Sequence, residues 1–263
     1  MQETSLSDLE VAEEMADAAR AAILPYFRKT SLHTANKLDD GFDPVTIADR
    51  NAEKAMRAVL ARHRPEDGIF GEEFGREEGS SGRTWVLDPI DGTRGFISGT
   101  PTWGVLIALS TTDGPIMGVI DQPYIGERFV GSADIAQFTG PSGTAPLKTR
   151  STSALDQAVV FTTFPEVGTP EDRAGFEAVA RQAKLTRYGM DCYAYALVAA
   201  GQVDLVIESS LNAYDIQAPI AVIEAAGGVV TDWRGGPAHN GGRALAAANP
   251  ELHAVALEIL RNY

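Results

Sequence analysis

The sequence predicts a protein of the α+β or α/β class that is built as two halves, each with helices and a sheet. Helical patterns come first, and from Pro65 onward short apolar runs separated by Gly, Pro and Asp indicate the strands of one sheet. Beyond residue 153 strand and helix patterns alternate, which is typical of a layered α/β unit. Residues 138–153 are rich in Gly, Pro, Ser and Thr, so we place the division between residues 1–145 and 146–263.

Two amphipathic helices are expected near the N-terminus. Ser7 opens a capping-box sequence, and apolar residues follow at helical spacing to about residue 29, with a kink expected at Pro25. A loop that contains residues 39–41 leads to the second helix, which Thr46 is expected to cap.

The remaining elements are shorter and are bounded by turn residues. The expected strands of the first half are GIF, TWVLD, WGVLIALS, IMGVID and ERFVGS. In the second half the expected strands are AVVFTTF, VDLVIES and VVTDW. Helices are expected near residues 171–184, in CYAYALVAAG, in AYDIQAPIAVIEAAGG and at residues 250–261.

Composition excludes several classes of partner and site. The 263-residue chain has a formal net charge of -14 and no run of basic residues, which argues against nucleic acid as its main partner. It shows no apolar stretch of membrane-spanning length and no signal-peptide pattern, so we expect a cytoplasmic protein without a membrane partner. Cys192 is the only cysteine and is expected in the core, and the four histidines lack the paired spacing of a zinc site.

The segment VLDPIDGT, residues 86–93, is the first candidate for a functional site. An apolar strand is expected to end at Asp88, and a turn after it can bring Asp91 back beside Asp88. Gly92 permits a positive φ or a close approach of a ligand to the backbone. Thr93 is expected to open a short helix, where its hydroxyl and backbone N–H can bind an anion.

Two neighbouring carboxylates repel each other unless a cation neutralises them. Oxygen ligands without nearby His or Cys favour Mg²⁺, Mn²⁺ or Ca²⁺, and an anion pocket beside them suggests a phosphate that bridges the metal. The same pattern also fits an ordinary Asp-Pro turn followed by a helix cap.

Further carboxylates strengthen the metal-site interpretation. Glu72 and Glu73 follow an expected strand in a glycine-bounded loop, where two adjacent acids have no evident packing role. Asp215 begins an expected helix and can act there as a cap. Asp49 lies in the first turn of the second helix, where a carboxylate suits the helix dipole as well as a metal site.

Together, GEE at 71–73, DPIDGT at 88–93 and YDIQAPIAVIEAAGG at 214–228 resemble the inositol monophosphatase superfamily of Mg²⁺-dependent phosphomonoesterases. VTIAD at 45–49 and the later GGVVTDW extend the resemblance over nearly the whole chain. It implies a layered α-β-α-β-α sandwich with the site between its halves, and a homodimer.

The resemblance also implies a set of metal ligands for two or three Mg²⁺ ions, with Mn²⁺ as a possible substitute. Glu72, Asp88 and the carbonyl of Ile90 would hold one ion. Asp88, Asp91 and Asp215 would hold a second, and Glu72 with water would hold a weaker third.

The catalytic roles that the resemblance implies fall on three residues. Thr93 and Glu72 would orient and deprotonate the attacking water, and Asp49 would assist. The amides of Gly92 and Thr93 would bind phosphate oxygens, and Asp91 and Asp215 would border the substrate together with the metal. The substrate would be a small phosphate monoester.

The choice of ester is expected to depend on Asp191 and Glu208. The resemblance places the leaving group against the helix start that contains Asp191, where the inositol enzymes carry small neutral residues. Two acids at these positions suit an ammonium or imidazolium group, and DGTRGFISGTPTWGVLIAL with GMDCYAYAL is similar to the histidinol-phosphate phosphatase branch. The preferred substrate is therefore L-histidinol phosphate, which belongs to histidine biosynthesis.

Several alternatives remain open from the sequence. Asp191 can instead be a helix N-cap, and Arg94 can either neutralise one of the acids or reach the phosphate. Inositol monophosphate, fructose bisphosphate and phosphoadenosine phosphate are the substrates of related branches. A non-catalytic regulatory protein of the same fold is the alternative from another functional class.

Overall fold

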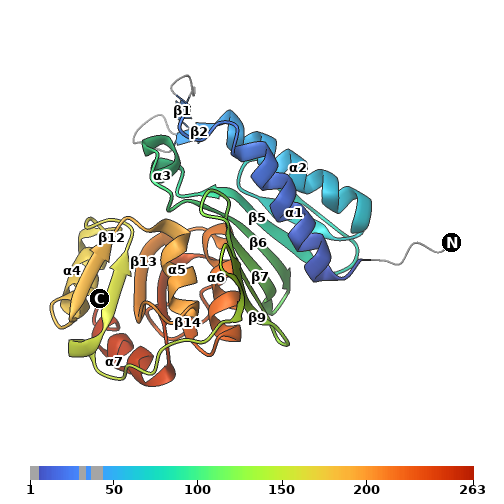
Figure 1. Ribbon diagram of the computed structural model, residues 1–263. Helices are drawn as coiled ribbons and strands as arrows, with labels where there is room; N and C mark the ends of the chain where they lie inside the picture. Colours follow the sequence, from blue (N-terminus) through green and yellow to red (C-terminus); the bar gives the residue numbers. More distant parts are fainter. Residues whose placement is uncertain (1–5, 30–33, 37–43) are drawn as a thin grey trace.

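The computed structural model describes residues 6–29, 34–36 and 44–263. The chain is arranged in five layers, in the order helix, sheet, helix, sheet, helix (Figure 1). The α-β-α-β-α sandwich expected from the sequence is therefore confirmed. The loop expected at residues 39–41 lies outside the described residues.

The first layer consists of α1 (Asp8–Ile23) and α2 (Ile47–His63), which lie side by side. Ser7 caps α1 through a capping box and Thr46 caps α2, as the sequence predicts. Helix α1 ends at Ile23, earlier than the expected residue 29, because Pro25 has no N–H with which to continue the helical hydrogen bonds.

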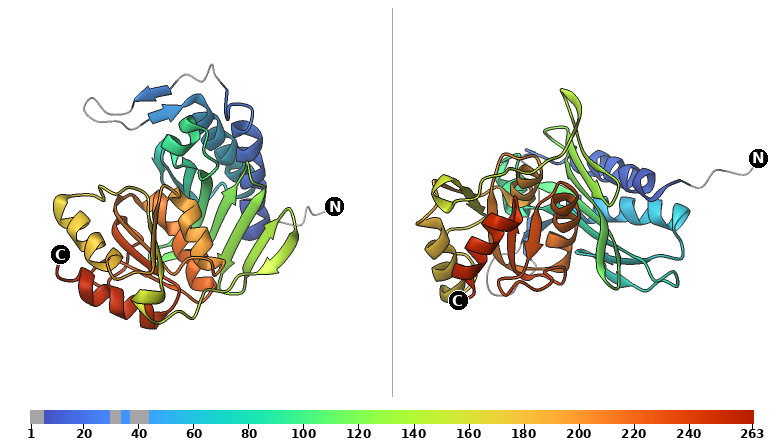
Figure 2. Two further views of the ribbon diagram at one scale, coloured as in Figure 1. Left: turned by 60° about the vertical axis from the view of Figure 1, so that its left-hand side comes forward. Right: turned by 90° about the horizontal axis from the view of Figure 1, so that it is seen from below.

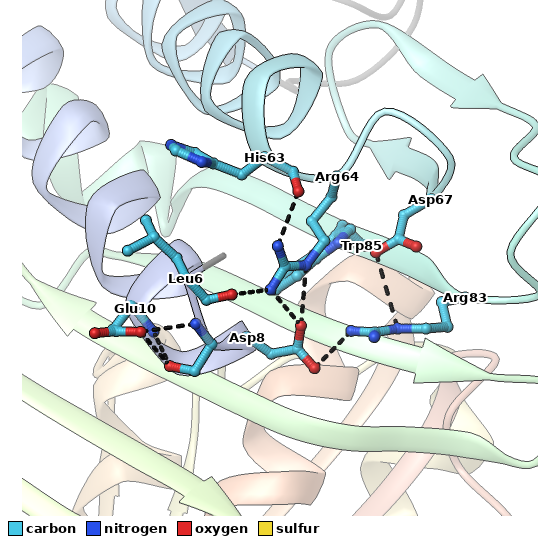
Figure 3. Close-up of polar contacts among 9 residues, drawn as sticks. Leu6, Asp8, Glu10, His63, Arg64, Asp67, Arg83 and Trp85 are labelled. Atoms are coloured by element: carbon cyan, nitrogen blue, oxygen red, sulfur yellow. Dashed lines mark hydrogen bonds and ion pairs between the residues drawn. The ribbon is translucent and has the colours of Figure 1, made fainter. Parts of the chain in front are cut away.

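Arginine side chains fix the beginning of α1 to the end of α2 and to the sheet (Figure 3). Arg64 donates to the carbonyl of Leu6 over 2.6 Å and to Asp8 over 2.9 Å, and Arg83 pairs with Asp8 at 2.7 Å. Burial raises the pKa of Asp8, but the bonds from Arg83 and Arg64 outweigh it and leave this pKa below its usual value. These contacts hold the first layer in place.

The second layer is an eight-stranded sheet with the order β10-β9-β8-β7-β6-β5-β3-β4. Neighbouring strands are antiparallel except β3 and β5, which are parallel. The strands are β3 (Gly68–Gly71), β4 (Gly75–Glu77), β5 (Thr84–Asp91), β6 (Gly104–Thr111), β7 (Gly114–Gln122), β8 (Glu127–Ser132), β9 (Ala136–Gly140) and β10 (Gly143–Pro146). A separate pair, β1 (Thr34–Asn36) and β2 (Pro44–Thr46), precedes α2.

Both faces of the sheet are buried at β5. Trp85 and Leu87 of β5 pack in the cluster with α1 and α2, and Val86 between them packs in the cluster with α5 and α6. This alternation follows from the two-residue period of a strand. The run WVL is apolar without a break because each of its faces meets a helical layer.

The third layer is formed by α5 (Asp191–Ala199) and α6 (Ala213–Ala225), which lie between the two sheets (Figure 2). Helix α6 lies against β5, β6, β7 and β8. A Cβ atom on Gly118 of β7 would overlap the backbone of Ala218, so the glycine lets α6 lie directly on the sheet. This contact determines how closely α6 packs on the sheet.

The fourth layer is a five-stranded sheet with the order β12-β11-β13-β15-β14. Strand β11 is parallel to β12 and β13, and β15 is antiparallel to β13 and β14. These strands are β11 (Val159–Thr162), β12 (Leu185–Tyr188), β13 (Leu205–Leu211), β14 (Val229–Thr231) and β15 (Gly242–Ala247), and the short 3-10 helix Leu155–Gln157 precedes them. The outer face carries α4 (Pro170–Ala180) and α7 (Pro250–Leu260), which form the fifth layer.

The predicted strands and helices of both halves are present, and the structure adds β4, the β9–β10 hairpin, β12 and β15. Strand β15 is short and its sequence GRALAA has no β-branched residue, which explains why the sequence pattern missed it. No helix in the described part of the chain has both the length and the apolar character needed to span a bilayer.

Candidate active site

The end of β5 places two aspartates at one edge of the eight-stranded sheet. Strand β5 continues to Asp91, whereas the sequence suggested a turn after Asp88. Asp88 pairs with Leu106 and Asp91 pairs with Gly104, so β5 contains an extra residue here and forms a bulge. The bulge is suited to Pro89, which has no N–H to donate to the neighbouring strand.

Three carboxylates meet at this bulge. Asp88, Asp91 and Asp215 each offer an oxygen within 4.8 Å of the others. The N–H of Asn212 donates to Oδ2 of Asp215 over 2.7 Å, so Asp215 also stabilises the first turn of α6. Asp215 therefore has both roles that the sequence suggested: it stabilises the helix start, and it is a member of the acidic cluster.

Burial and crowding make these carboxylates unstable as free anions. Burial raises the pKa of Asp88 well above its usual value, and the charges of Glu72, Asp91 and Asp215 raise it further. Burial also raises the pKa of Asp91, followed by the charges of Asp191 and Asp215, although hydrogen bonding with Cys192 acts in the opposite direction. A divalent cation with oxygen ligands would remove this repulsion, and the donor set fits such an ion.

Glu72 and Glu73 follow β3, but they face different surroundings. The N–H of Glu72 donates to the carbonyl of Leu87 over 3.1 Å, which places Glu72 beside the residue that precedes Asp88. The carboxyl of Glu73 lies 3.6 Å from Arg50 and raises the pKa of Asp49. Glu72 is therefore the member of the pair that joins the acidic cluster.

Thr93 connects the end of β5 to the start of α2. It is the first residue of α3 (Thr93–Ser98), as expected, and Gly92 before it has a φ of 79°. The hydroxyl of Thr93 lies 3.0 Å from the carbonyl oxygen of Ile90 and 3.5 Å from Oδ1 of Asp49. Helix α2 thus contributes directly to the site.

Asp49 has two roles in the fold. Its Oδ2 accepts from the N–H and the hydroxyl of Thr46, at 2.9 and 2.6 Å, which completes the capping box of α2. Burial raises the pKa of Asp49 to about 6, although the hydrogen bonds from Thr46 lower it. Asp49 therefore stabilises the start of α2 with one oxygen and contacts Thr93 with the other.

Asp191 is the first residue of α5, and its charge acts on Asp91 of the cluster. The N-cap of α5 is Met190, and no side chain caps this helix, so the N-cap alternative for Asp191 does not describe the structure. Oδ2 of Asp191 instead accepts from the hydroxyl of Thr102 over 2.9 Å. Burial raises the pKa of Asp191, and the bond from Thr102 and the charge of Arg94 lower it.

The start of α5 is also bonded directly to the acidic cluster. The N–H of Cys192 donates to Oδ2 of Asp91 over 2.6 Å. Cys192 itself is buried, as predicted. A Cβ atom on Gly92 would lie 2.6 Å from Cγ of Asp191, so this position requires glycine for space as well as for its φ. Asp191 is therefore packed against the Asp91-Gly92 corner.

Glu208 lies in the middle of β13, just before an irregularity in its pairing with β15, and is only 6% exposed. Its Oε1 accepts from the N–H and the hydroxyl of Thr163, at 2.6 and 2.8 Å. Burial raises the pKa of Glu208 to about 7, the bonds from Thr163 lower it, and the charge of Asp191 raises it. Asp191 and Glu208, which the sequence assigned to the leaving group, are thus near enough for the charge of one to act on the other.

Arg94 and Phe164 flank these two acids. The guanidinium of Arg94 lies 4.9 Å from the centre of the Phe164 ring, which is 42% exposed. Phe164 follows Thr163, so Glu208 holds the segment that carries this ring. Phe164, Thr102 and Thr163 carry no signal in the sequence, because their relevance comes from contacts between distant segments.

Comparisons with known proteins support the arrangement. The family model described as the inositol monophosphatase family matches residues 6–263. The bifunctional phosphatase IMPL2, chloroplastic, of Arabidopsis thaliana is 41% identical, with 98% of this chain and 78% of the relative covered. A histidinol-phosphatase of Chlorobaculum parvum is 37% identical, with 92% of each protein covered.

A solved structure described as an inositol monophosphatase from Zymomonas mobilis is also similar to this chain. It is 41% identical, has a TM-score of 0.85 and aligns over 97% of each chain. The relatives thus include phosphatases named for histidinol phosphate and for inositol phosphate. The comparisons indicate the reaction class and leave the ester to be decided by the residues around the site.

Proposed function

The chain belongs to the inositol monophosphatase family and is a phosphatase of that family, and we propose that it is a Mg²⁺-dependent enzyme that hydrolyses L-histidinol phosphate to L-histidinol and phosphate. The observation that carries the choice of ester is the pair of acids next to the acidic cluster, the half-buried Asp191 and the buried Glu208. The family and the cluster support the reaction, and the pair supports the cationic leaving group.

The residues that would hold metal are the three clustered aspartates, Glu72 and the carbonyl of Ile90. Their oxygen-only chemistry matches Mg²⁺, with Mn²⁺ as a substitute. When bound, such ions lower the pKa of a bound water and neutralise the charge of the phosphate. The pKa values of Asp88 and Asp91 support this role, because the free cluster is unstable as a set of anions.

Thr93 and Glu72 would act on the attacking water. The hydroxyl proton of Thr93 is directed to Ile90 O or to Asp49, so the oxygen of Thr93 remains able to accept a hydrogen bond from water. This bond orients the water, and a carboxylate oxygen of Glu72 then receives its proton. The backbone N–H groups of Gly92 and Thr93 would bind phosphate oxygens.

The leaving group would lie between Asp191 and Glu208. Thr102 bonds to one oxygen of Asp191, and Thr163 bonds to one oxygen of Glu208. Each carboxylate has a second oxygen, and a substrate ammonium or imidazolium can bind there. A neutral polyol gains less from these two acids, because it carries no positive charge to pair with a carboxylate.

Arg94 acts on one of these two acids. Its charge lowers the pKa of Asp191, and its guanidinium packs on Phe164. These contacts favour the first of the two roles that the sequence left open, in which Arg94 balances an acid of the substrate pocket. A cationic leaving group would compete with Arg94 for Asp191.

The test is phosphate release from a panel of esters at saturating Mg²⁺. L-Histidinol phosphate should give a kcat/KM at least about tenfold above that of inositol 1-phosphate, fructose 1,6-bisphosphate and phosphoadenosine phosphate. An equal or higher value for inositol 1-phosphate would support the second candidate, which the Zymomonas mobilis relative favours. No release from any ester would support the non-catalytic alternative.

A further inference from the structure

We propose that Glu53 is a positioning residue that fixes the backbone around Glu72 and thereby sets the metal affinity of the site. The inference rests on the proposed function, because it takes Glu72 as a metal ligand. Glu53 lies in the middle of α2 and its side chain is fully buried. A buried carboxylate is costly unless several donors satisfy it, and the donors around Glu53 explain its presence.

Both oxygens of Glu53 bind the turn that follows Glu72. Oε2 accepts from the N–H of Glu73 over 2.7 Å, and Oε1 accepts from the N–H of Phe74 over 3.2 Å. A Cβ atom on Gly71 would overlap the same carboxylate, so the residue before Glu72 also lies against it. Glu53 therefore contacts the backbone on both sides of Glu72.

Arg57, one turn further along α2, completes this contact. Its Nε donates to Glu53 over 2.9 Å, and its Nη2 donates to the carbonyl of Gly75 over 2.6 Å. The carboxylate and the guanidinium together bind consecutive backbone groups of residues 73–75. This arrangement stabilises a single conformation of the turn between β3 and β4.

The opposite side of Glu72 is fixed to β5. The N–H of Glu72 donates to Leu87, the residue before Asp88. With its own N–H bonded to β5 and the following N–H groups bonded to Glu53, Glu72 has little backbone freedom. Its carboxylate is therefore presented to the aspartate cluster without a further ordering cost when a metal binds.

Helix α2 also carries Asp49, four residues before Glu53 and on the same helix face. Asp49 reaches Thr93, and Glu53 reaches the Glu72 turn. One rigid helix thus sets the separation between the two residues that are proposed to act on water. Residues that hold a metal ligand in place without binding the metal typically change metal affinity by about 10- to 100-fold when they are replaced.

The test is a calorimetric titration of the full chain with Mn²⁺ alone, which needs no substrate. Glu53→Gln keeps the size of the side chain, but its NH₂ group cannot accept from a backbone N–H. We expect its Mn²⁺ affinity to fall about tenfold or more, and the Mg²⁺ concentration for half-maximal phosphate release to rise in parallel. The KM for the ester at saturating Mg²⁺ should change by less than about twofold.

Glu77→Gln is the matched control, because Glu77 contacts the same Arg57 at 3.3 Å from an exposed position. This variant should keep the wild-type Mn²⁺ affinity. If Glu53→Gln lowers the melting temperature but binds Mn²⁺ as the wild type does, Glu53 is only structural and the inference is wrong.

Arg57→Lys provides a milder second variant if Glu53→Gln does not fold. A lysine cannot bind Glu53 and the carbonyl of Gly75 with the geometry of a guanidinium, so a smaller loss of Mn²⁺ affinity is expected. An unchanged affinity in a folded Arg57→Lys would also contradict the inference. The titration separates this question from the substrate, because a preference for another ester leaves the predicted change in Mn²⁺ affinity intact.

Discussion

Oγ1 of Thr93 lies 3.5 Å from Oδ1 of Asp49, although 44 positions separate the two residues in the chain. The contact joins the first turn of α2 to the first turn of α3 at the end of β5. It places a hydroxyl between a carboxylate with a raised pKa and the carbonyl of Ile90. Because the hydroxyl is held in this way, its lone pairs have a defined direction. A group that orients a water molecule needs such a direction.

Thr93→Ala should therefore lower kcat more than it changes KM. We expect a loss of roughly 100-fold in kcat, in the range that a positioned proton-transfer group contributes, and a KM within about threefold of the wild type. Steady-state kinetics of phosphate release measure both, with Thr93→Ser as the control that keeps the hydroxyl. In a double variant with Glu72→Gln the losses should be less than additive, and strictly additive losses would assign the two residues to independent roles.

Removal of divalent metal should abolish phosphate release. The clustered carboxylates offer only oxygen ligands, so activity should disappear in excess chelator and return with Mg²⁺ or Mn²⁺. Full activity in excess chelator would contradict the metal-dependent mechanism. A titration of released phosphate against free Mg²⁺ makes the measurement quantitative.

Asp88→Asn should separate stability from function. Asp88 is 2% exposed and lies among other acids, so loss of its charge relieves repulsion in the metal-free protein and should raise its melting temperature. The same change should remove most metal binding and activity, because a carboxylate of the cluster is lost. Wild-type turnover of Asp88→Asn at saturating Mg²⁺ would refute the proposed role of this residue.

Asp191→Asn tests the proposed substrate. A charge-assisted contact contributes about 1.5 to 3 kcal/mol, so KM for L-histidinol phosphate should rise roughly tenfold to 100-fold. Hydrolysis of glycerol phosphate, which has a neutral leaving group, should stay nearly unchanged. Equal losses on both esters would remove the basis for the choice of histidinol phosphate and leave the phosphatase assignment in place.

His253 of α7 should make the stability of the fold depend on pH, independently of the site. Burial lowers the pKa of His253, and the charge of Arg261 lowers it further. The unfolded chain therefore binds the proton more readily, and stability should fall as the pH drops below about 6.5, the ordinary pKa of histidine. Urea unfolding at pH 8 and pH 5.5 should show this part of the loss in the wild type and not in His253→Gln.

The fold was predictable where local patterns and burial agree. The capping box at Ser7, the cap at Thr46 and the apolar run of β5 predicted elements that the structure contains. The acidic cluster was predictable as a group, because Asp88 and Asp91 are close in sequence and Asp215 matches a family motif. Sequence patterns could not indicate that Pro89 lies in a bulge, since the pairing with β6 decides it.

Contacts between distant segments account for what the sequence did not predict. Thr102 is 89 positions from Asp191, and Thr163 is 45 positions from Glu208. Nothing around either threonine indicates a partner. Glu53 was also missed, because a glutamate in a helix usually lies at the surface, and only its bonds to Glu73 and Phe74 explain its burial.

The direct packing of α6 on Gly118 limits how the molecule can move. Asp215 belongs to α6, whereas Asp88 and Asp91 belong to the sheet beneath it. A hinge motion that lifted α6 from β7 would pull Asp215 away from its two neighbours and break the cluster. We therefore expect ligands to enter and leave while the two halves remain packed together. We expect the motion that admits a ligand to involve side chains and short loops, such as the segment that carries the exposed ring of Phe164.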